Sequence, residues 1–329
     1  MERLLITLIL VCTMNNITNA QNPFYGQYHT PHEAVPFDRI ETEHYEPAIL
    51  EGIKLQNAEI EAIIQNPEKA DFTNTIEAFE ESGKLLDKVV AVFGNMLSAE
   101  TNDDLQELAQ KIMPLLSEHS NNITLNEKLF ARVKEVYNQK ETLQLTQEQK
   151  QLLENAYNSF IRHGANLEGE AREEYRRLTT ELSKLTLTFS ENNLKETNAY
   201  QMLLTKKESL AGLPEIIIEA AAETAKNEEK EGWAFTLHAP SYIPFMTYSD
   251  NRDLRQKLYM AYNTKCTHDN EFNNIDIVKK IANTRMKIAQ LLGYKDYAEY
   301  TLKKRMAENS KSVYKLLNQL RSEEHTSDS

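Results

Sequence analysis

Apolar residues recur every three or four positions along most of this chain, which is the spacing that places them on one face of an α-helix. From Tyr45 onward this pattern predicts one helix after another. The five clearest helical segments are residues 74–97, 101–116, 124–137, 146–164 and 175–189. The last of these spans only about two heptads, so an intramolecular helical hairpin is favoured over a dimeric coiled coil.

Capping residues predict where these helices begin and end. A Ser, Thr, Asp or Asn side chain accepts a hydrogen bond from a backbone N–H of the first helical turn. Gly164 is expected to stop the helix that starts at Thr146. Pro114 is expected to kink or end the helix that starts at Thr101. The expected start positions are Asn74, Thr101, Thr124, Thr146 and Asp250.

The helical pattern is interrupted between residues 199 and 237. The segments AYQMLLT (199–205) and GWAFTLH (232–238) are short, apolar and rich in β-favouring residues. They predict a small two-stranded ribbon around a helix at residues 214–226. Helix then resumes as far as Leu320, and no fixed-period repeat indicates a solenoid. The predicted fold is therefore mainly α, with one small β ribbon.

The composition narrows the class of protein. The chain has 329 residues, enough for one large domain or roughly two. Only 9 Gly and 9 Pro argue against a turn-rich all-β protein. With 37 Lys+Arg against 50 Asp+Glu, the net charge is −13. Because an acidic chain is repelled by phosphate backbones, no nucleic-acid partner is expected.

The first 20 residues have the layout of a signal peptide. Arg3 is followed by an apolar run to Cys12, and Thr18-Asn19-Ala20 supplies a small-x-small pattern. The run is too short to span a bilayer, so export to the periplasm or the medium is expected, without integral membrane association. Lipid attachment at Cys12 is the alternative, and Val11, where a small residue is required, disfavours it.

The only other cysteine is Cys266, so the exported chain is expected to contain no internal disulfide. Nothing near Cys266 indicates a Cys/His nucleophile pair. We therefore interpret it as a passive, partly buried residue.

Few residues of this chain carry a recognisable catalytic pattern. It has no Gly-rich phosphate loop and no G-x-S-x-G elbow. The zinc-peptidase motif H-E-x-x-H needs two His one helical turn apart. His32-Glu33 begins such a motif, but Pro36 replaces the second His, and Pro31 and Pro36 both oppose a helix. This segment is predicted to be a loop and not a metal site.

The remaining histidines are interpreted structurally. His268 and Glu271 are three residues apart in a polar stretch. They could form a weak metal contact or a solvated cluster at a helix end, and the second is favoured. His119 and His163 are each expected at a helix C-terminus, where an imidazolium suits the helix dipole.

Acidic pairs and aromatic residues give no clear site either. Glu80-Glu81 and Glu173-Glu174 lie among counter-charges and are interpreted as solvated helix faces. Tyr242, Phe245 and Tyr248 are expected to pack in a core or on the ribbon, in preference to forming a platform for a substrate. No catalytic, cofactor-binding or metal-ligating residue is therefore predicted in this chain.

One stretch is more specific: GWAFTLHAPSYIPFMTYSDNRDLRQKLYMAYNTKC, residues 232–266. It resembles the region upstream of the catalytic part of the thimet-oligopeptidase-like zinc metallopeptidases. The similarity is strongest to their peptidyl-dipeptidase Dcp and oligopeptidase A branch. Further similar segments follow the same order in both, so chance similarity is improbable. These segments are residues 36–49, 74–83, 97–103, 116–133, 182–200 and 291–307.

The resemblance implies a two-lobed helical peptidase whose deep channel admits short peptides. In that family one zinc ion is held by the two His of H-E-F-G-H and a later Glu, and the motif Glu is the general base. All of these residues follow the region matched here, so none is carried over to this chain. The resemblance implies a helical N-terminal lobe at 21–200 and, at 201–320, the ribbon and the start of the catalytic lobe. It also implies a monomer, with zinc only in the full-length parent.

The chain ends in nine polar residues, RSEEHTSDS (321–329). One reading frame of a common sequencing adapter encodes the first seven. We therefore expect a non-native tail after Leu320 and a truncated reading frame, with a natural polar tail as the alternative.

The expected function is that of an N-terminal fragment of an exported zinc peptidyl-dipeptidase or oligopeptidase, inactive by itself. The alternative is a secreted helical module that binds a peptide or a partner without catalysis. A third, weaker hypothesis is one half of a split enzyme.

Overall fold

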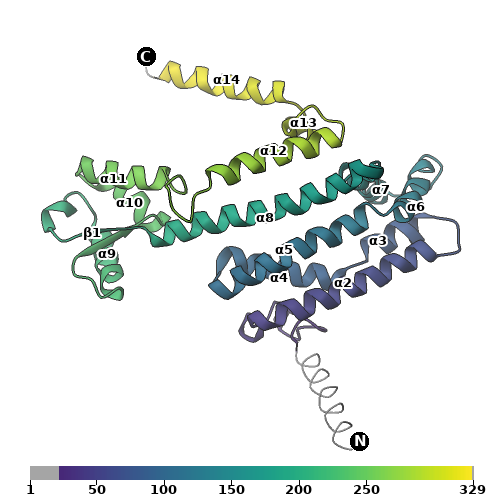
Figure 1. The fold of residues 1–329 in the computed structure, drawn as a ribbon, viewed down its shortest axis with the longest axis horizontal. Helices are drawn as coiled ribbons and strands as arrows, with labels where there is room; N and C mark the ends of the chain where they lie inside the picture. Colours follow the sequence, from purple (N-terminus) through teal and green to yellow (C-terminus); the bar gives the residue numbers. More distant parts are fainter. Residues whose placement is uncertain (1–21, 328–329) are drawn as a thin grey trace, which may run out of the picture. The chain divides into compact units, whose positions relative to one another are not determined.

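The computed structural model describes residues 22–327, with side chains up to residue 321, and it is mainly α-helical (Figure 1). The mainly α prediction is confirmed. The predicted signal peptide, residues 1–20, lies outside the described residues. The chain divides into two compact units. The first holds the described residues up to Ser183 and from Lys287 onward, and the second holds Lys184–Met286.

The first unit is built from helices and short helical turns. Two 3-10 turns, Pro31–Glu33 (η1) and Phe37–Arg39 (η2), precede the long helices. Two helices, α8 (Gly169–Ala199) and α12 (Ile275–Leu291), contribute residues to both units. The other elements are α2 (Thr42–Gln65), the π-helical turn η3 (Phe72–Glu77), α3 (Ala78–Glu80), α4 (Lys84–Ala99), α5 (Asp103–Thr124), α6 (Glu127–Asn138), α7 (Gln147–Arg162), α13 (Tyr297–Leu302) and α14 (Ser310–Ser327).

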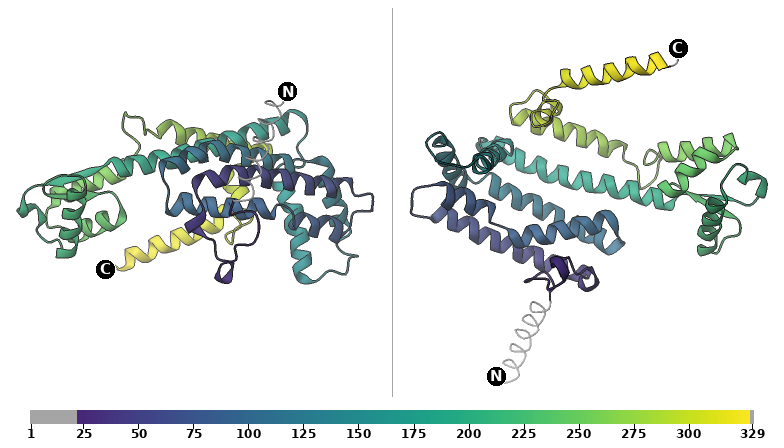
Figure 2. Two further views of the ribbon diagram at one scale, coloured as in Figure 1. Left: turned by 90° about the horizontal axis from the view of Figure 1, so that it is seen from below. Right: turned by 180° about the vertical axis from the view of Figure 1, so that it is seen from behind.

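The core of the first unit gathers apolar faces that are far apart in the sequence. Its largest cluster joins residues of α2, η3, α6 and α7. Phe160 lies at its centre, with its ring 5.4 Å from that of Phe79 and 5.8 Å from that of Phe130. Helices α2 and α4 lie side by side, as both views of Figure 2 show. The buried residues include Ile60, Ile76, Leu129, Val133 and Leu153.

A second cluster of this unit joins α8 and α12, and a separate contact fixes α13. Tyr175 and Leu178 of α8 pack with Leu125, and burial raises the pKa of Tyr175. The guanidinium of Arg162 lies 4.2 Å over the ring of Tyr300, and its Nη2 donates to the carbonyl of Tyr300 at 3.1 Å. This contact ties the end of α7 to α13 across 138 residues of sequence.

The second unit contains the predicted ribbon. Strands β1 (Gln201–Leu204) and β2 (Trp233–Thr236) pair antiparallel, with Gln201 opposite Thr236. The ribbon prediction is confirmed, and the rings of Phe235 and Phe245 meet edge to face at 4.6 Å in its core. The other elements are η4 (Lys207–Leu210), α9 (Glu215–Asn227), α10 (Ala239–Tyr248) and α11 (Arg252–Asn263).

The continuous helix predicted at residues 74–97 is wrong. Asp71, not Asn74, caps this segment, and the chain forms the π-helical turn η3 before the short α3. Gly83 then adopts a φ of +78°, and α4 begins after it. The backbone N–H of Gly83 donates to Oε2 of Glu59 at 2.7 Å, a partner 24 residues away. Such a left-handed break favours glycine, and the helical spacing does not reveal it.

Three predicted helix starts are wrong by one or two residues, and in each case an asparagine provides the cap. Asn102 replaces Thr101, and its Oδ1 accepts from the N–H of Leu105 at 2.8 Å. Asn126 replaces Thr124, whose hydroxyl instead donates to the carbonyl of Ser120 inside α5. The third is Asn251 in place of Asp250.

Two other predictions at helix ends have opposite outcomes. The start at Thr146 is confirmed, with Gln149 completing a capping box, and Gly164 follows α7 with a φ of +85°. Of the kink or end predicted at Pro114, the end is wrong, because α5 continues through this proline to Thr124. The helix loses one backbone donor there, while its buried face on both sides of the proline still packs. Similarly, α14 continues past Leu320 to Ser327.

Candidate functional site

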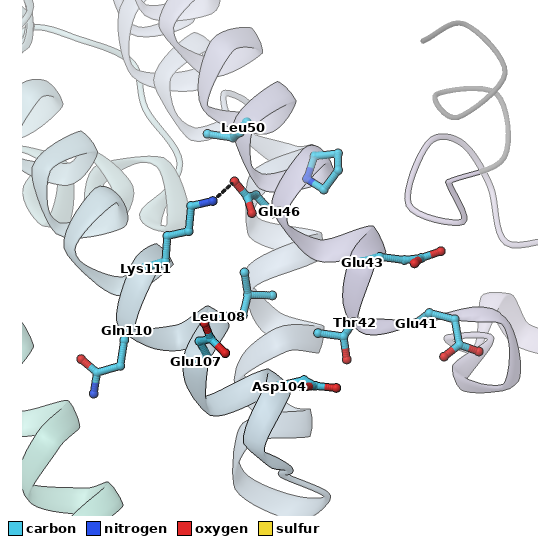
Figure 3. A pocket seen from close by; sticks show the side chains of 11 residues that line it. Glu41, Thr42, Glu43, Glu46, Leu50, Asp104, Glu107, Leu108, Gln110 and Lys111 are labelled. Atoms are coloured by element: carbon cyan, nitrogen blue, oxygen red, sulfur yellow. Dashed lines mark hydrogen bonds and ion pairs between the residues drawn. The ribbon is translucent and has the colours of Figure 1, made fainter. Parts of the chain in front are cut away.

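A groove in the described part of the chain lies between the start of α2 and α5 (Figure 3). It encloses about 1090 Å³ and is open to solvent. Five carboxylates and one lysine line it, so its field is negative. The lining residues are Glu41, Thr42, Glu43, Glu46, Pro47, Leu50, Asp104, Glu107, Leu108, Gln110 and Lys111.

The single lysine neutralises only part of this charge. Nζ of Lys111 lies 2.5 Å from Oε1 of Glu46, and the two side chains join α5 to α2 (Figure 3). The carboxylates of Glu41, Glu43 and Asp104 line the groove without an ion pair to that lysine. The groove is therefore suited to hold a cationic group, such as a peptide ammonium or a basic side chain.

The acidic residues also have a structural role, since several of them lie in the first turns of helices. Glu43 occupies the first turn of α2, and Asp104 that of α5. A carboxylate at this position stabilises a helix through its dipole.

Sequence reasoning missed the groove because α2 and α5 meet only in the folded chain. The available signal was the density of acidic residues at two helix starts.

The described residues offer no ligand set for the zinc ion that the resemblance implies. Among them, no three His, Cys, Asp or Glu side chains gather closely enough to hold a metal ion. His32 and Glu33 lie in the 3-10 turn η1, where both have a positive φ, so the prediction that the prolines prevent an α-helix here is confirmed. No chemical step is therefore assigned to a metal bound by these residues.

His268 has a different neighbour from the one its sequence position indicated. Its Nε2 lies 3.7 Å from a carboxylate oxygen of Glu196, at the end of α8. Glu196 also accepts a hydrogen bond from the backbone N–H of Cys266. Cys266 is buried, and its pKa is raised to about 11, first by burial and then by the Glu196 carboxylate. These residues connect α8 to the loop after α11.

Of the two histidines predicted at helix C-termini, only one lies there. His163 is the C-cap of α7, with Nδ1 2.8 Å from the carbonyl of Ser159. His119 lies inside α5, five residues before its last residue, and is buried. Its Nε2 is 2.7 Å from Oε1 of Gln56, and burial lowers its pKa. The imidazolium interpretation is therefore wrong for His119, because its environment favours the neutral ring.

The aromatic run of α10 divides between core and surface. Phe245 is fully buried, and the ring of Tyr242 stacks on that of Tyr262 at 4.2 Å, which confirms the packing prediction for both. For Tyr248 that prediction is wrong, since 52% of this residue is exposed. The difference follows from its place at the last residue of α10.

The two acidic pairs lie on exposed helix faces. In the first, Glu81 forms an ion pair with Lys84. In the second, Glu174 pairs with Arg177 at 2.7 Å, and this hydrogen bond lowers the pKa of Glu174. These contacts confirm solvated faces.

None of the helices in the described residues is long and apolar enough to cross a bilayer.

Comparison with known proteins shows what this chain is similar to. Residues 245–327 match the model of peptidase family M3. The chain is also 34% identical over 300 residues to dipeptidyl carboxypeptidase from Escherichia coli, an alignment that covers 91% of this chain and 44% of that protein. The chain is therefore similar to proteins of peptidase family M3. This conclusion agrees with the resemblance found in the sequence.

Other M3 relatives align over similar lengths. Oligopeptidase A from Salmonella typhimurium is 30% identical over 91% of this chain and 44% of its own length. The probable cytosolic oligopeptidase A of Arabidopsis thaliana is 28% identical over 93% of this chain and 44% of its own length. The chain therefore spans less than half the length of these curated relatives.

Proposed function

We propose that this chain is the N-terminal portion of a zinc-dependent peptidase that cleaves short peptides, and that the chain alone does not hydrolyse them. One observation carries the proposal: the alignment with Escherichia coli dipeptidyl carboxypeptidase covers 91% of this chain and 44% of the relative. In the proposed parent, residues 21–200 form a helical lobe, and residues 201–320 hold the ribbon and the start of the catalytic lobe. The parent acts as a monomer, by dipeptide release or internal cleavage.

The proposal divides the chemistry between two parts of the parent. The resemblance implies that H-E-x-x-H and the later Glu follow the matched region, so the zinc ion and the general base would belong there. When bound, zinc would activate the water that attacks the peptide carbonyl. This chain would supply one wall of the channel. Its acidic groove between α2 and α5 would favour peptides that carry positive charge.

We expect the 329-residue chain to show no peptide hydrolysis above buffer, with or without added zinc. The comparison is a longer product of the same locus, obtained by long-read sequencing across the codon for Leu320. If that product carries H-E-x-x-H, it should cleave a short fluorogenic peptide, lose activity with a chelator and regain it with zinc. The matched inactive control is a variant of this longer product in which the Glu of H-E-x-x-H is replaced by Gln.

Two outcomes would contradict this proposal. Metal-dependent hydrolysis by the 329-residue chain would show that it holds a complete site. A reading frame that stops after Ser329 in intact genomic DNA would favour the alternative, a helical module that binds a peptide or a partner.

We also propose that the chain is exported to the periplasm or the medium. The support is the charged start, apolar run and small-x-small pattern of residues 1–20. Mass spectrometry of the protein expressed in its own host should find a mature N-terminus at Gln21 in the exported fraction. An intact Met1 in the cytoplasmic fraction would reject export.

A further inference from the structure

Exposed apolar side chains concentrate in the segment that matches the M3 family model. Twenty large apolar residues of the described chain are exposed, and twelve of them lie at residues 245–321. That segment is 77 of the 300 residues with described side chains, about a quarter. The segment before residue 245 carries the other eight. Large exposed apolar patches mark interaction surfaces in soluble proteins.

Helix α14 shows this most clearly. Its apolar positions recur at helical spacing, which in a soluble protein marks the face that packs against a core. Here that face is more than half exposed: Tyr314 65%, Leu316 58%, Leu317 52% and Leu320 53%. Contact with α13 leaves this face open. These residues therefore have the spacing of a buried helix face, while their side chains are exposed to solvent.

The length of the M3 relatives indicates what covers this face. Helix α14 falls within residues 245–327, so it is part of the matched family segment. The relatives contain more than twice the polypeptide that this chain aligns with, since the alignment covers 44% of each. A second copy of this chain fits less well. A second copy would carry the same net charge of −13, and this repulsion opposes its association.

We propose that the apolar face of α14 is a docking surface for the catalytic portion of an M3 peptidase, and that it binds this portion even when the two are separate polypeptides. The inference rests on the proposed function and adds an interface to it. The partner is expected to present an apolar helical surface that accepts Leu316, Leu317 and Leu320. Burial of these side chains supplies the driving force.

The test measures binding, so it does not depend on peptidase activity. The probe is the portion of Escherichia coli dipeptidyl carboxypeptidase that this chain does not span, produced separately. We expect a 1:1 complex with the full chain by light scattering and calorimetry. The double variant Leu317→Asp/Leu320→Asp should weaken binding at least about 100-fold, because two carboxylates would be buried without partners. Both leucines are exposed in the free chain, so circular dichroism should show an unchanged fold.

Ile216→Asp provides the matched control. Ile216 is 72% exposed on α9, outside the matched segment, and the same substitution there should leave binding unchanged. Three results would overturn the inference: no complex, equal binding by the chain and the double variant, or a homodimer that the double variant abolishes. Each is distinct from a failure of the proposed function, which would appear as metal-dependent hydrolysis by the 329-residue chain or as a reading frame that stops after Ser329.

Discussion

Replacing Phe160 with alanine should lower the free energy of unfolding by about 3–5 kcal/mol, the range measured when large buried aromatic residues are truncated. Phe160 is 1% exposed and contacts the rings of Phe79 and Phe130. Its removal leaves a cavity where α6, α7 and η3 meet, and neighbouring side chains can fill such a cavity only in part. Urea denaturation, followed by circular dichroism, measures the change as a lower midpoint.

Phe37→Ala is the matched control for this prediction. Phe37 lies in η2 and is 51% exposed, so the same truncation removes little buried area there. We expect a change in the free energy of unfolding below about 1 kcal/mol. Equal midpoints for the two variants would contradict the assignment of Phe160 to the centre of the core.

The sequence was sufficient where structure depends on local interactions. The capping box of Thr146 and Gln149 and the stop at Gly164 involve residues close in sequence, and both are as predicted. The ribbon was predictable because its strands differ in composition from the helices around them. The class of fold therefore followed from spacing and composition alone.

Tertiary contacts explain most of the errors. Gly83 breaks the helix predicted at 74–97, and the partner of its N–H is Glu59, in a different helix. His119 became a buried neutral side chain because α5 packs against α2, which supplies Gln56. Neither partner is within 20 residues, so no local pattern indicates either contact.

The same limit applies to the candidate site. The acidic groove joins residues 41–50 to residues 104–111, and each segment alone has an ordinary acidic helix start. The neighbour of His268 is Glu196, 72 positions away, although Glu271 is only three away. The family resemblance indicated the class of enzyme, because it draws on ordered motifs along the whole chain instead of on single contacts.

The thiol of Cys266 should react about 100-fold more slowly with iodoacetamide in the folded chain than in the chain unfolded in urea, at any pH below 9. Only the thiolate is nucleophilic, and a pKa of about 11 in place of 9.0 lowers the thiolate fraction by about that factor. Burial is the main cause and the Glu196 carboxylate the second. Mass spectrometry of the labelled peptide separates Cys266 from Cys12.

The raised pKa also makes stability depend on pH in a defined window. The folded chain holds the thiol proton more tightly than the unfolded chain, so this contribution to stability is complete below pH 9. It is lost as the pH rises from 9.0 to about 11, where the unfolded thiol ionises first. Glu196→Gln keeps an acceptor for the backbone N–H of Cys266 but removes the negative charge. This variant should therefore be alkylated faster at Cys266, and the pH range over which the thiol contributes to stability should be narrower. Alkylation at the wild-type rate would show that burial alone protects the thiol.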